Sequence, residues 1–370
     1  MKLLLLTASA YALVPSRKLA PGPRYASARR EETMVLGAVG AGALRYAVPA
    51  VAGLYAARAV KRKLAKGSRP YDREANSVGR EYDAWTREGI LEHYWGEHIH
   101  LGYYTDEEME KGYLKKDFIE AKLNFTQRMM AWGGVNDATT AAGGKDVKIL
   151  DVGCGIGGTT RYMATQLPEA KITGITLSPE QRDRATALAK EQGITNVDFM
   201  VKDALAMDFA DESFDVVWGC ESGEHMPDKK KYVTEMARVL RPGGKQVVAT
   251  WCQRDNATQA FTAEEADSLD FLYSEWTHPY FISVNDYARL FASEAGLKDV
   301  VQDDWAKETI ASWRHSIWVG VFDPWPVVFA GPRMWWKCFR DGVCLERMHK
   351  AFDRGLMEYG MIKGTKPLSA

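Results

Sequence analysis

Two short segments carry the residue types from which a chemical site could be built. Residues 151–158 read DVGCGIGG, so one carboxylate precedes four glycines within eight positions. Glycines let the backbone come close to a ligand, and a helix that follows such a loop offers free N–H groups. Residues 220–227 read CESGEHMP and contain Glu221, Glu224 and His225. Carboxylate and imidazole groups can position a hydroxyl and exchange its proton, so this second segment is a candidate for acid–base chemistry.

The glycine loop fits two kinds of nucleotide site. Counted from Gly153, it satisfies the G-x-G-x-x-G pattern of dinucleotide-binding proteins, with Gly158 in the third position. Two features argue against a dinucleotide. The charge of Asp151 opposes a pyrophosphate and suits a cation, and the end of the next expected strand has no acid for a ribose before Glu180. A site for a cationic nucleotide is therefore favoured, with NAD as the alternative.

Both segments lie in a region, between Lys145 and Gly244, that alternates β-rich runs with helical stretches. The expected strands cover 147–150, 171–176, 197–201, 214–218 and 245–250, and the expected helices 160–166, 179–192 and 232–240. Repeated strand–helix units predict an α/β fold with a parallel, doubly wound sheet. Ligands of such sheets lie beyond the carboxyl ends of the strands, and both segments directly follow a strand.

Further motifs, in the same order, resemble those of class I S-adenosylmethionine methyltransferases. Residues 202–204 resemble the family's adenine contact, with Asp203 accepting from the exocyclic amine, and 240–244 resemble its turn before the fifth strand. The usual acidic ribose ligand is missing, and residues 174–181 resemble instead the subgroup that contains sterol, cyclopropane-fatty-acid and tocopherol methyltransferases. The resemblance implies a Rossmann-like, mostly parallel seven-stranded sheet and S-adenosylmethionine as cofactor. The cofactor-binding residues that it implies are Asp151, Gly153, Cys154, Gly155, Gly157, Thr176, Leu177, Ser178, Gln181, Asp203 and Ala204.

Motifs on both flanks make the sequence look closely like γ-tocopherol methyltransferases of plants, algae and cyanobacteria. They are WGEHIHLGYY at 95–104, DVGCGIGG at 151–158, GITLSPEQ at 174–181, ESGEHMP at 221–227 and TWCQRD at 250–255. The resemblance runs from about residue 82 to 366 and is most specific at ESGEHMP, where sterol C24-methyltransferases differ. It implies methyl transfer to an aromatic ring carbon of a prenylated chromanol. Another lipid methyltransferase, acting on a prenyl-benzoquinol or a sterol, and a non-catalytic binding module are the alternatives.

For attack by a ring carbon, the phenol must give up its proton. We expect His225, supported by Glu224 or Glu221, to take or share that proton, and these three are the expected catalytic residues. The alternative is an ordinary loop histidine whose hydrogen bonds are satisfied locally.

Aromatic and histidine side chains are expected to cover the cofactor and line an apolar substrate pocket. Aromatic faces attract a sulfonium as they attract an ammonium ion, and seven of the twelve tryptophans follow residue 270. His98 and His100, beside Glu97, could also be read as metal ligands, but no third ligand follows at a familiar spacing, so no metal is predicted. Ordinary core packing is the alternative for any one of the rings. The expected lid and substrate residues are Tyr94, Trp95, His98, His100, Tyr104, Tyr280 and Trp313.

Charge is distributed unevenly along the 370 residues. The net charge is −1, but residues 1–70 hold 13 basic and two acidic side chains, whereas the remaining 300 hold 35 basic and 47 acidic ones. The basic excess therefore lies outside the expected methyltransferase domain, which argues against a nucleic-acid partner. Five scattered cysteines without a CxxC pair predict a reduced compartment rather than a disulfide framework.

The N-terminal residues are expected to direct and tether the protein. Residues 1–33 combine a Leu run, a small-residue cleavage site and a basic stretch, which resembles the bipartite plastid presequences of algae with complex plastids. A frayed basic N-terminus is the alternative. Residues 34–70 are apolar, rich in Gly and Ala, and end in a basic cluster that suits an anionic membrane surface.

The methyltransferase domain is expected to cover residues 71–370. It would begin with a helical cap, continue with a cofactor core over 145–255, and end with a helical and aromatic substrate region over 256–370. The expected partners are an apolar prenylated phenol and a membrane surface in the plastid, at its envelope or thylakoid, and no protein partner is inferred.

Overall fold

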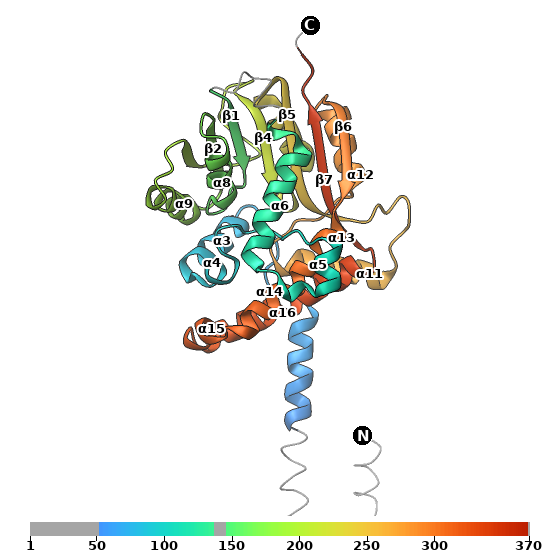
Figure 1. Ribbon diagram of the computed structural model, residues 1–370. Coiled ribbons are helices and arrows are strands. Elements are labelled where there is room, and N and C mark those ends of the chain that lie inside the picture. The colour runs from blue at the N-terminus through green and yellow to red at the C-terminus, as the bar shows by residue number, and fades with distance from the viewer. Residues whose placement is uncertain (1–51, 137–145, 369–370) are drawn as a thin grey trace, which may run out of the picture. The chain divides into compact units, whose positions relative to one another are not determined.

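The computed structural model describes residues 52–136 and 146–368 (Figure 1). The chain divides into two units, Met1–Lys63 and Leu64–Ala370, and the second is called the main unit below. In the first unit, the described residues 52–63 are helical. The predicted presequence and residues 34–51 of the predicted tether lie outside the described residues. Within the part of the chain that is described, no helix is both long and apolar enough to cross a membrane.

Seven strands of the main unit form one sheet in the order β3-β2-β1-β4-β5-β7-β6. Only β7 runs antiparallel to its neighbours. The strands are β1 Lys148–Val152, β2 Lys171–Thr176, β3 Val197–Val201, β4 Phe214–Cys220, β5 Leu240–Gln253, β6 Lys298–Asp304 and β7 Met357–Thr365. The predicted α/β class and the seven-stranded, mostly parallel sheet are therefore confirmed.

The five strands located in the sequence are all present. The fifth is longer than expected because β5 first pairs with β4 at Leu240 and pairs again only from Lys245, so residues 241–244 interrupt the ladder. Strands β6 and β7 were not located from the sequence. The residues of β6 are largely exposed and polar and form no apolar run, and two glycines and two charged residues interrupt the apolar residues of β7.

Helices cover both faces of this sheet. On one face, Phe125 of α6 (Phe118–Gly133) and Met163 of α8 (Gly158–Gln166) pack in a cluster with Ile149 of β1. On the other face, Met236 of α10 (Lys229–Val239) packs in a cluster with Leu150. Successive residues of β1 thus supply opposite faces, as the alternation of side chains along a strand requires.

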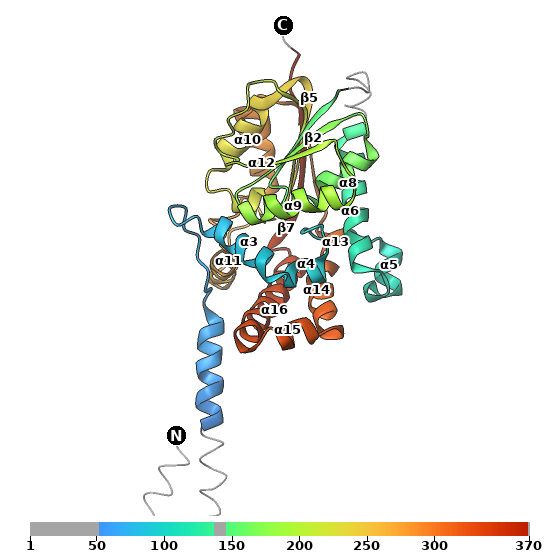
Figure 2. The ribbon, with the colours of Figure 1, turned by 90° about the vertical axis from the view of Figure 1, so that its left-hand side faces the viewer.

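The remaining helices form a layer below the sheet in Figure 1, at the end where the parallel strands terminate, and Figure 2 shows the same layer from the side. This layer contains α3 Ser77–Glu88, α4 Ile90–Trp95, α5 Asp106–Lys111, α11 Ala263–Glu275, α13 Ala306–Thr309, α14 Ala311–Phe322, α15 Trp325–Phe329 and α16 Pro332–Asp353. The other helices and helical turns are α6 Phe118–Gly133, α8 Gly158–Gln166, α9 Pro179–Glu191, α10 Lys229–Val239, α12 Val284–Arg289, η1 Tyr113–Lys115, η2 Gly223–His225 and η3 Leu290–Glu294.

A buried ion-pair network joins parts of the helical layer. The fully buried carboxylate of Glu275 on α11 accepts hydrogen bonds from Arg340 of α16 and from Arg69. Arg69 also pairs with Glu81 of α3 and Asp341 of α16. Because a buried charge without a partner is costly, this network fixes three helices and the segment before α3 against one another.

Candidate functional site

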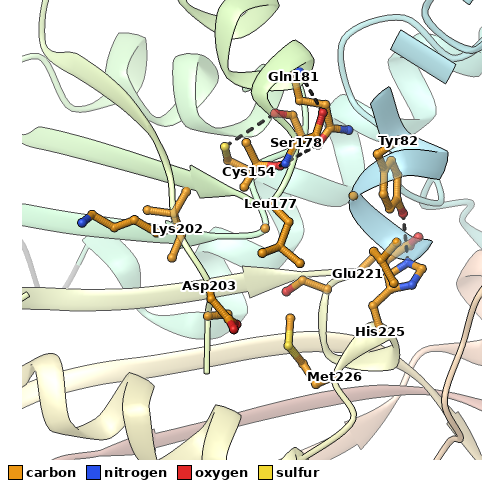
Figure 3. A pocket seen from close by; sticks show the side chains of 18 of the residues that line it. Tyr82, Cys154, Leu177, Ser178, Gln181, Lys202, Asp203, Glu221, His225 and Met226 are labelled. Atoms are coloured by element: carbon orange, nitrogen blue, oxygen red, sulfur yellow. Dashed lines mark hydrogen bonds between the residues drawn. The ribbon is translucent and has the colours of Figure 1, made fainter. Parts of the chain in front are cut away.

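Two cavities lie where the sheet meets the helical layer. The first, of about 290 Å³, is lined by the residues that follow β1, β2, β3 and β4 and by residues of the 71–82 segment (Figure 3). The second, of about 960 Å³, is lined mainly by apolar side chains of α3, α4, α14, α15 and α16. Tyr82, Ile99, Glu221 and His225 line both cavities. The cavities therefore adjoin, and these four residues form their shared wall.

The glycine loop after β1 has the backbone geometry that its sequence suggests. Gly153, Gly155 and Gly157 all have positive φ. At Gly153, a Cβ atom would lie 2.4 Å from the Cβ of Ser222, so a side chain does not fit. The N–H groups of Gly153 and Cys154 both donate to the carbonyl of Ile175 at 2.9 Å, which ties the loop to β2. Only glycine combines this close approach with a left-handed conformation.

Asp151 lines the first cavity, and its carboxylate accepts a buried hydrogen bond. The hydroxyl of Thr160 on α8 donates to its carboxylate at 2.6 Å, and burial raises the pKa of Asp151 to about 7. Near neutral pH this carboxyl group is therefore poised between its charged and neutral forms.

The segment after β2 presents ordered polar groups to the same cavity. The hydroxyl of Thr176 donates to the Gln181 amide oxygen at 2.7 Å, and Ser178 caps α9 by accepting from the N–H of Gln181 at 3.0 Å. The Gln181 amide nitrogen lies 3.9 Å from where a Cβ of Gly155 would stand. Asp83 of α3 accepts from the Ser178 hydroxyl and so connects the helical layer to this wall.

Asp203 stands at the end of β3, at the edge of the first cavity. One carboxylate oxygen accepts from the Leu205 N–H at 2.9 Å, and the other lies 4.0 Å from the guanidinium of Arg73. The neighbouring Ala204 is buried and lines the cavity. Arg73 was not selected from the sequence, and it comes from the segment before α3.

His225 lies in the wall shared by the two cavities. Its Nε2 atom forms a 2.9 Å hydrogen bond with the Tyr82 hydroxyl (Figure 3). Its ring stacks on His278 at a centroid distance of 4.5 Å. Burial, with a further contribution from the positive charge of Lys229, lowers the pKa of His225 to about 3. The imidazole is therefore neutral at physiological pH. Burial also raises the pKa of Tyr82, so its hydroxyl remains protonated and donates to Nε2.

The two glutamates of this loop are buried and hydrogen-bonded to other elements. Glu221, at a φ of 48°, accepts from the Leu101 N–H at 2.7 Å and from the Tyr359 hydroxyl at 2.6 Å. Glu224 accepts from the Thr250 hydroxyl at 2.7 Å. Burial raises the pKa of Glu221 to about 8, with repulsion from Glu224 as the next cause, and burial raises the pKa of Glu224 to about 7.

Lys229 is a buried cation that sequence reasoning missed. Its Nζ atom donates to the carbonyls of Gly223 at 2.8 Å and Glu224 at 3.0 Å, and so holds the turn that carries His225. Burial lowers the pKa of Lys229 to about 7. In the sequence it opens a run of three lysines, and nothing distinguishes it from Lys230 and Lys231, which the structure leaves more exposed.

The expected lid residues lie in different places. Tyr94, Trp95 and Trp313 line the larger cavity, and His100 lines the smaller. The other three lie outside both linings: the His98 ring contacts the Thr159 hydroxyl, the Tyr104 hydroxyl bonds to His315, and Tyr280 lies under the Lys229 ammonium. In the described part of the chain, no three His, Cys, Asp or Glu side chains are grouped as metal ligands would be.

Comparison with known proteins identifies the class of protein that this fold and site define. A family profile described as "Methyltransferase domain" matches residues 149–244, which run from β1 to the start of β5. A solved structure of geranyl diphosphate C-methyltransferase from Streptomyces coelicolor, in complex with geranyl diphosphate and S-adenosyl-L-homocysteine, has the same fold, with a TM-score of 0.59 at 18% identity over 80% of this chain and 99% of that one. The chain is a class I S-adenosylmethionine-dependent methyltransferase.

Two curated relatives place the chain more narrowly. It is 40% identical to 2-methyl-6-phytyl-1,4-hydroquinone methyltransferase of Synechocystis sp., over 79% of this chain and 88% of the relative. It is 35% identical to the chloroplastic tocopherol O-methyltransferase of Arabidopsis thaliana, over 76% of this chain and 79% of the relative. The chain therefore belongs to the family of tocopherol and phytylhydroquinone methyltransferases, as the sequence motifs predicted.

Proposed function

We propose that the protein transfers a methyl group to an aromatic ring carbon of a prenylated phenol, converting γ-tocopherol to α-tocopherol. The observation that carries this proposal is the large apolar cavity that adjoins the cofactor pocket at Tyr82, Glu221 and His225. A prenyl tail needs a long apolar wall, and a phenol needs polar groups only at its hydroxyl end. Among the polar residues that line the larger cavity, Tyr82, Glu221 and His225 also line the smaller one.

The smaller cavity suits S-adenosylmethionine. The left-handed glycines allow close backbone approach, and Asp203, with one oxygen anchored by a backbone N–H, is placed to accept from an adenine amine. Thr176 and Gln181 would lie along the ribose side. When bound, this cofactor supplies an electrophilic methyl group on a positively charged sulfur. The protein's main contribution is alignment of the two ligands across the shared wall.

The low basicity of His225 determines at which step of the reaction it accepts the proton. A phenol has a pKa of about 10, far above the value of about 3 for His225, so His225 does not deprotonate the resting acceptor. Once the ortho carbon has formed its bond to the methyl group, the hydroxyl belongs to a cationic ring and is strongly acidic. The proton then passes to Nε2 of His225, while the Tyr82 hydroxyl turns away.

Restoring the aromatic ring requires loss of one more proton from the methylated carbon. Burial gives Glu221 and Glu224 raised pKa values, so their carboxylates are stronger bases than exposed ones. In this proposal Glu224 takes the ring proton, His225 returns its proton to the oxygen, and the net reaction releases a single proton. The apolar wall excludes water from the site during both transfers.

A second acceptor is favoured by one observation. The phytylhydroquinone methyltransferase is 40% identical to this chain and the tocopherol enzyme 35%, so a prenylated hydroquinone is the alternative substrate. The same wall would serve it, since its reactive carbon is also ortho to a hydroxyl.

The deciding experiment supplies methyl-labelled S-adenosylmethionine with γ-tocopherol, a phytyl-benzoquinol or a Δ24 sterol, each in detergent. We expect the highest kcat/KM with γ-tocopherol. Preference for the quinol would move the assignment to the alternative, and preference for the sterol would contradict both. Binding of the cofactor without turnover of any acceptor would indicate a non-catalytic protein.

We also propose a plastid location, because the presequence pattern agrees with the chloroplastic plant relative. Residues 1–33 would be removed, residues 34–63 would associate with the membrane, and the main unit from Leu64 onward would form the enzyme. A fluorescent protein fused behind residues 1–70 should enter plastids, and a fluorescent signal that stays in the cytosol would contradict the assignment.

A further inference from the structure

Exposed aromatic side chains are concentrated in one short part of the main unit. In the described part of this unit, nine large hydrophobic side chains that are at least one-third exposed lie within residues 318–339, and five lie elsewhere. Six of the nine are rings stacked or tilted in pairs along the chain: Trp318 with Phe322, Trp325 with Phe329, and Trp336 with Phe339. We call residues 318–339 the aromatic edge. Apolar surface this concentrated usually marks an interaction site.

The aromatic edge is formed by helices on the outer side of the helical layer. It spans the end of α14, all of α15 and the start of α16, which Figures 1 and 2 show together at the end of the main unit that lies away from the sheet. Phe322, Trp325 and Phe329 have exposed fractions of 67%, 61% and 81% and take no part in lining either cavity.

The edge is also the rim of the larger cavity. Val321, Val328, Trp335 and Phe339 line that cavity, yet each remains 40% to 55% exposed. A side chain can do both only where the cavity reaches the surface. The aromatic edge therefore contains an opening of the cavity that Tyr82 and His225 also line.

The charges of the edge suit an apolar surrounding. Residues 318–339 contain two basic side chains, Arg333 and Lys337, and one acidic one, Asp323, although the chain after residue 70 is strongly acidic. Lys337 is paired with Glu88 and Arg340 with Glu275, so neither presents a bare charge. Arg333 is left to approach anionic groups, and the one carboxylate of the edge, that of Asp323, is hydrogen-bonded to the His93 ring.

We infer that the aromatic edge inserts into the surface of a lipid bilayer, and that the larger cavity takes up its apolar substrate directly from the lipid. The second half of this inference rests on the proposed function, whereas the binding of lipid does not. Paired Trp and Phe rings with a basic side chain are typical of helices that lie in the membrane interface. A second copy of the chain placed on the edge would instead cover the opening that a substrate needs.

The test compares the full chain with a triple variant, Phe322→Gln, Trp325→Gln and Phe329→Gln. These rings face outward and lie outside the cavity linings, so catalysis on a detergent-dissolved acceptor should be unchanged. The matched control is Leu114→Gln with Val301→Gln, which removes side chains 39% and 45% exposed elsewhere on the main unit. Both variants keep residues 1–70, so any binding by that segment is common to all three proteins.

Partitioning is measured by flotation with phosphatidylcholine vesicles that contain about 20% phosphatidylglycerol. We expect the triple variant to lose at least about tenfold in partition coefficient, and the control to lose little. Methylation of an acceptor embedded in the same vesicles should fall in parallel. Unchanged partitioning together with unchanged methylation of the embedded acceptor would overturn the inference.

A dimer of the unchanged chain that the triple variant abolishes, with vesicle partitioning intact, would also overturn it and assign the edge to a second copy. If neither the unchanged chain nor either variant methylates γ-tocopherol or the quinol in detergent, the proposed function fails. Flotation still decides whether the edge binds lipid.

Discussion

The contact between Tyr82 and His225 joins residues that are 143 positions apart in the chain. Tyr82 belongs to the helix before the sheet and His225 to the turn after β4, and both side chains line both cavities. The hydroxyl and the imidazole therefore act as one unit, and replacing either should affect the other.

Removing the His225 imidazole should lower kcat far more than cofactor binding. For His225→Ala we expect kcat to fall by about 100-fold or more, as loss of a proton-transferring group does. Tyr82→Phe keeps the ring and should lower kcat about tenfold, which corresponds to the loss of one hydrogen bond. The double variant should be no slower than His225→Ala, because both changes remove the same unit. Kinetics and calorimetric titration of S-adenosylmethionine would measure this, and equal losses in kcat and cofactor affinity would contradict it.

The raised pKa of Glu221 should appear in stability. In the folded protein it holds its proton to about pH 8, whereas an unfolded glutamate has its ordinary pKa of 4.5 and releases the proton near that pH. The stabilisation from this protonated group is therefore complete below pH 4.5 and is lost as the pH rises through 8. Glu221→Gln mimics the protonated form, so its Tm should be similar to that of the unchanged protein at about pH 5 and a few degrees higher at about pH 9. Thermal unfolding at both pH values tests this; a variant that is no more stable at the higher pH would contradict it.

At the residue scale, the sequence predicts which groups have reactive chemistry better than it predicts their partners. His225 and the glycine loop could be selected because their types and spacing are informative on their own. Tyr82, Arg73 and Lys229 could not, since their roles depend on contacts across the fold or on the burial of one lysine in a run of three. Tyr104 was expected in the lid because it is aromatic, but the structure places its hydroxyl on His315.

At the scale of elements, the strand–loop–helix unit from β1 to α8 positions the cofactor pocket. Apolar runs predicted its strands correctly because central strands are buried on both faces. Strand β6 lacks such a run, since it lies at the edge of the sheet and is largely exposed. The sequence also predicted cap helices in general, but the ion pairs that fix them involve residues as distant as Arg69 and Asp341.

The loop between β1 and α8 should not tolerate even one methyl group at Gly153. Gly153→Ala combines a left-handed conformation with a contact of 2.4 Å to Ser222, so we expect a loss of stability of about 2–4 kcal/mol and a loss of cofactor binding. Gly193→Ala is the matched control, because Gly193 also has positive φ but no atom within 4 Å of the added Cβ. Gly193→Ala should lower the free energy of unfolding by about 1 kcal/mol and leave cofactor affinity unchanged. Denaturant unfolding and calorimetric titration would distinguish the two variants, and equal effects would contradict the role of the close contact.

At the scale of the whole molecule, the main unit begins before the expected domain boundary at residue 71. The carbonyl of Leu64 accepts from Arg347, the carbonyl of Lys66 accepts from Arg340, and Arg69 joins the Glu275 network. These contacts make residues 64–70 part of the folded unit rather than a linker.

Two truncations test this boundary. A chain that starts at Leu64 should keep the Tm of the full chain and its kcat on a detergent-dissolved acceptor. A chain that starts at Tyr71 leaves Glu275 with fewer partners and should lose about 3–5 kcal/mol. Equal stability of the two truncated chains, measured by denaturant unfolding, would show that residues 64–70 do not stabilise the main unit.

The shared wall also has a consequence for the order in which ligands come and go. The smaller cavity reaches the surface beside Arg73 and Asp203, whereas the larger one reaches it between the rings of the aromatic edge. Each ligand thus enters through a separate opening. The demethylated nucleotide can dissociate into water while the lipid product is still bound, and a new lipid can bind before the nucleotide is exchanged. Binding should accordingly follow a random sequence, and a non-reactive analogue of the nucleotide should not compete with the lipid.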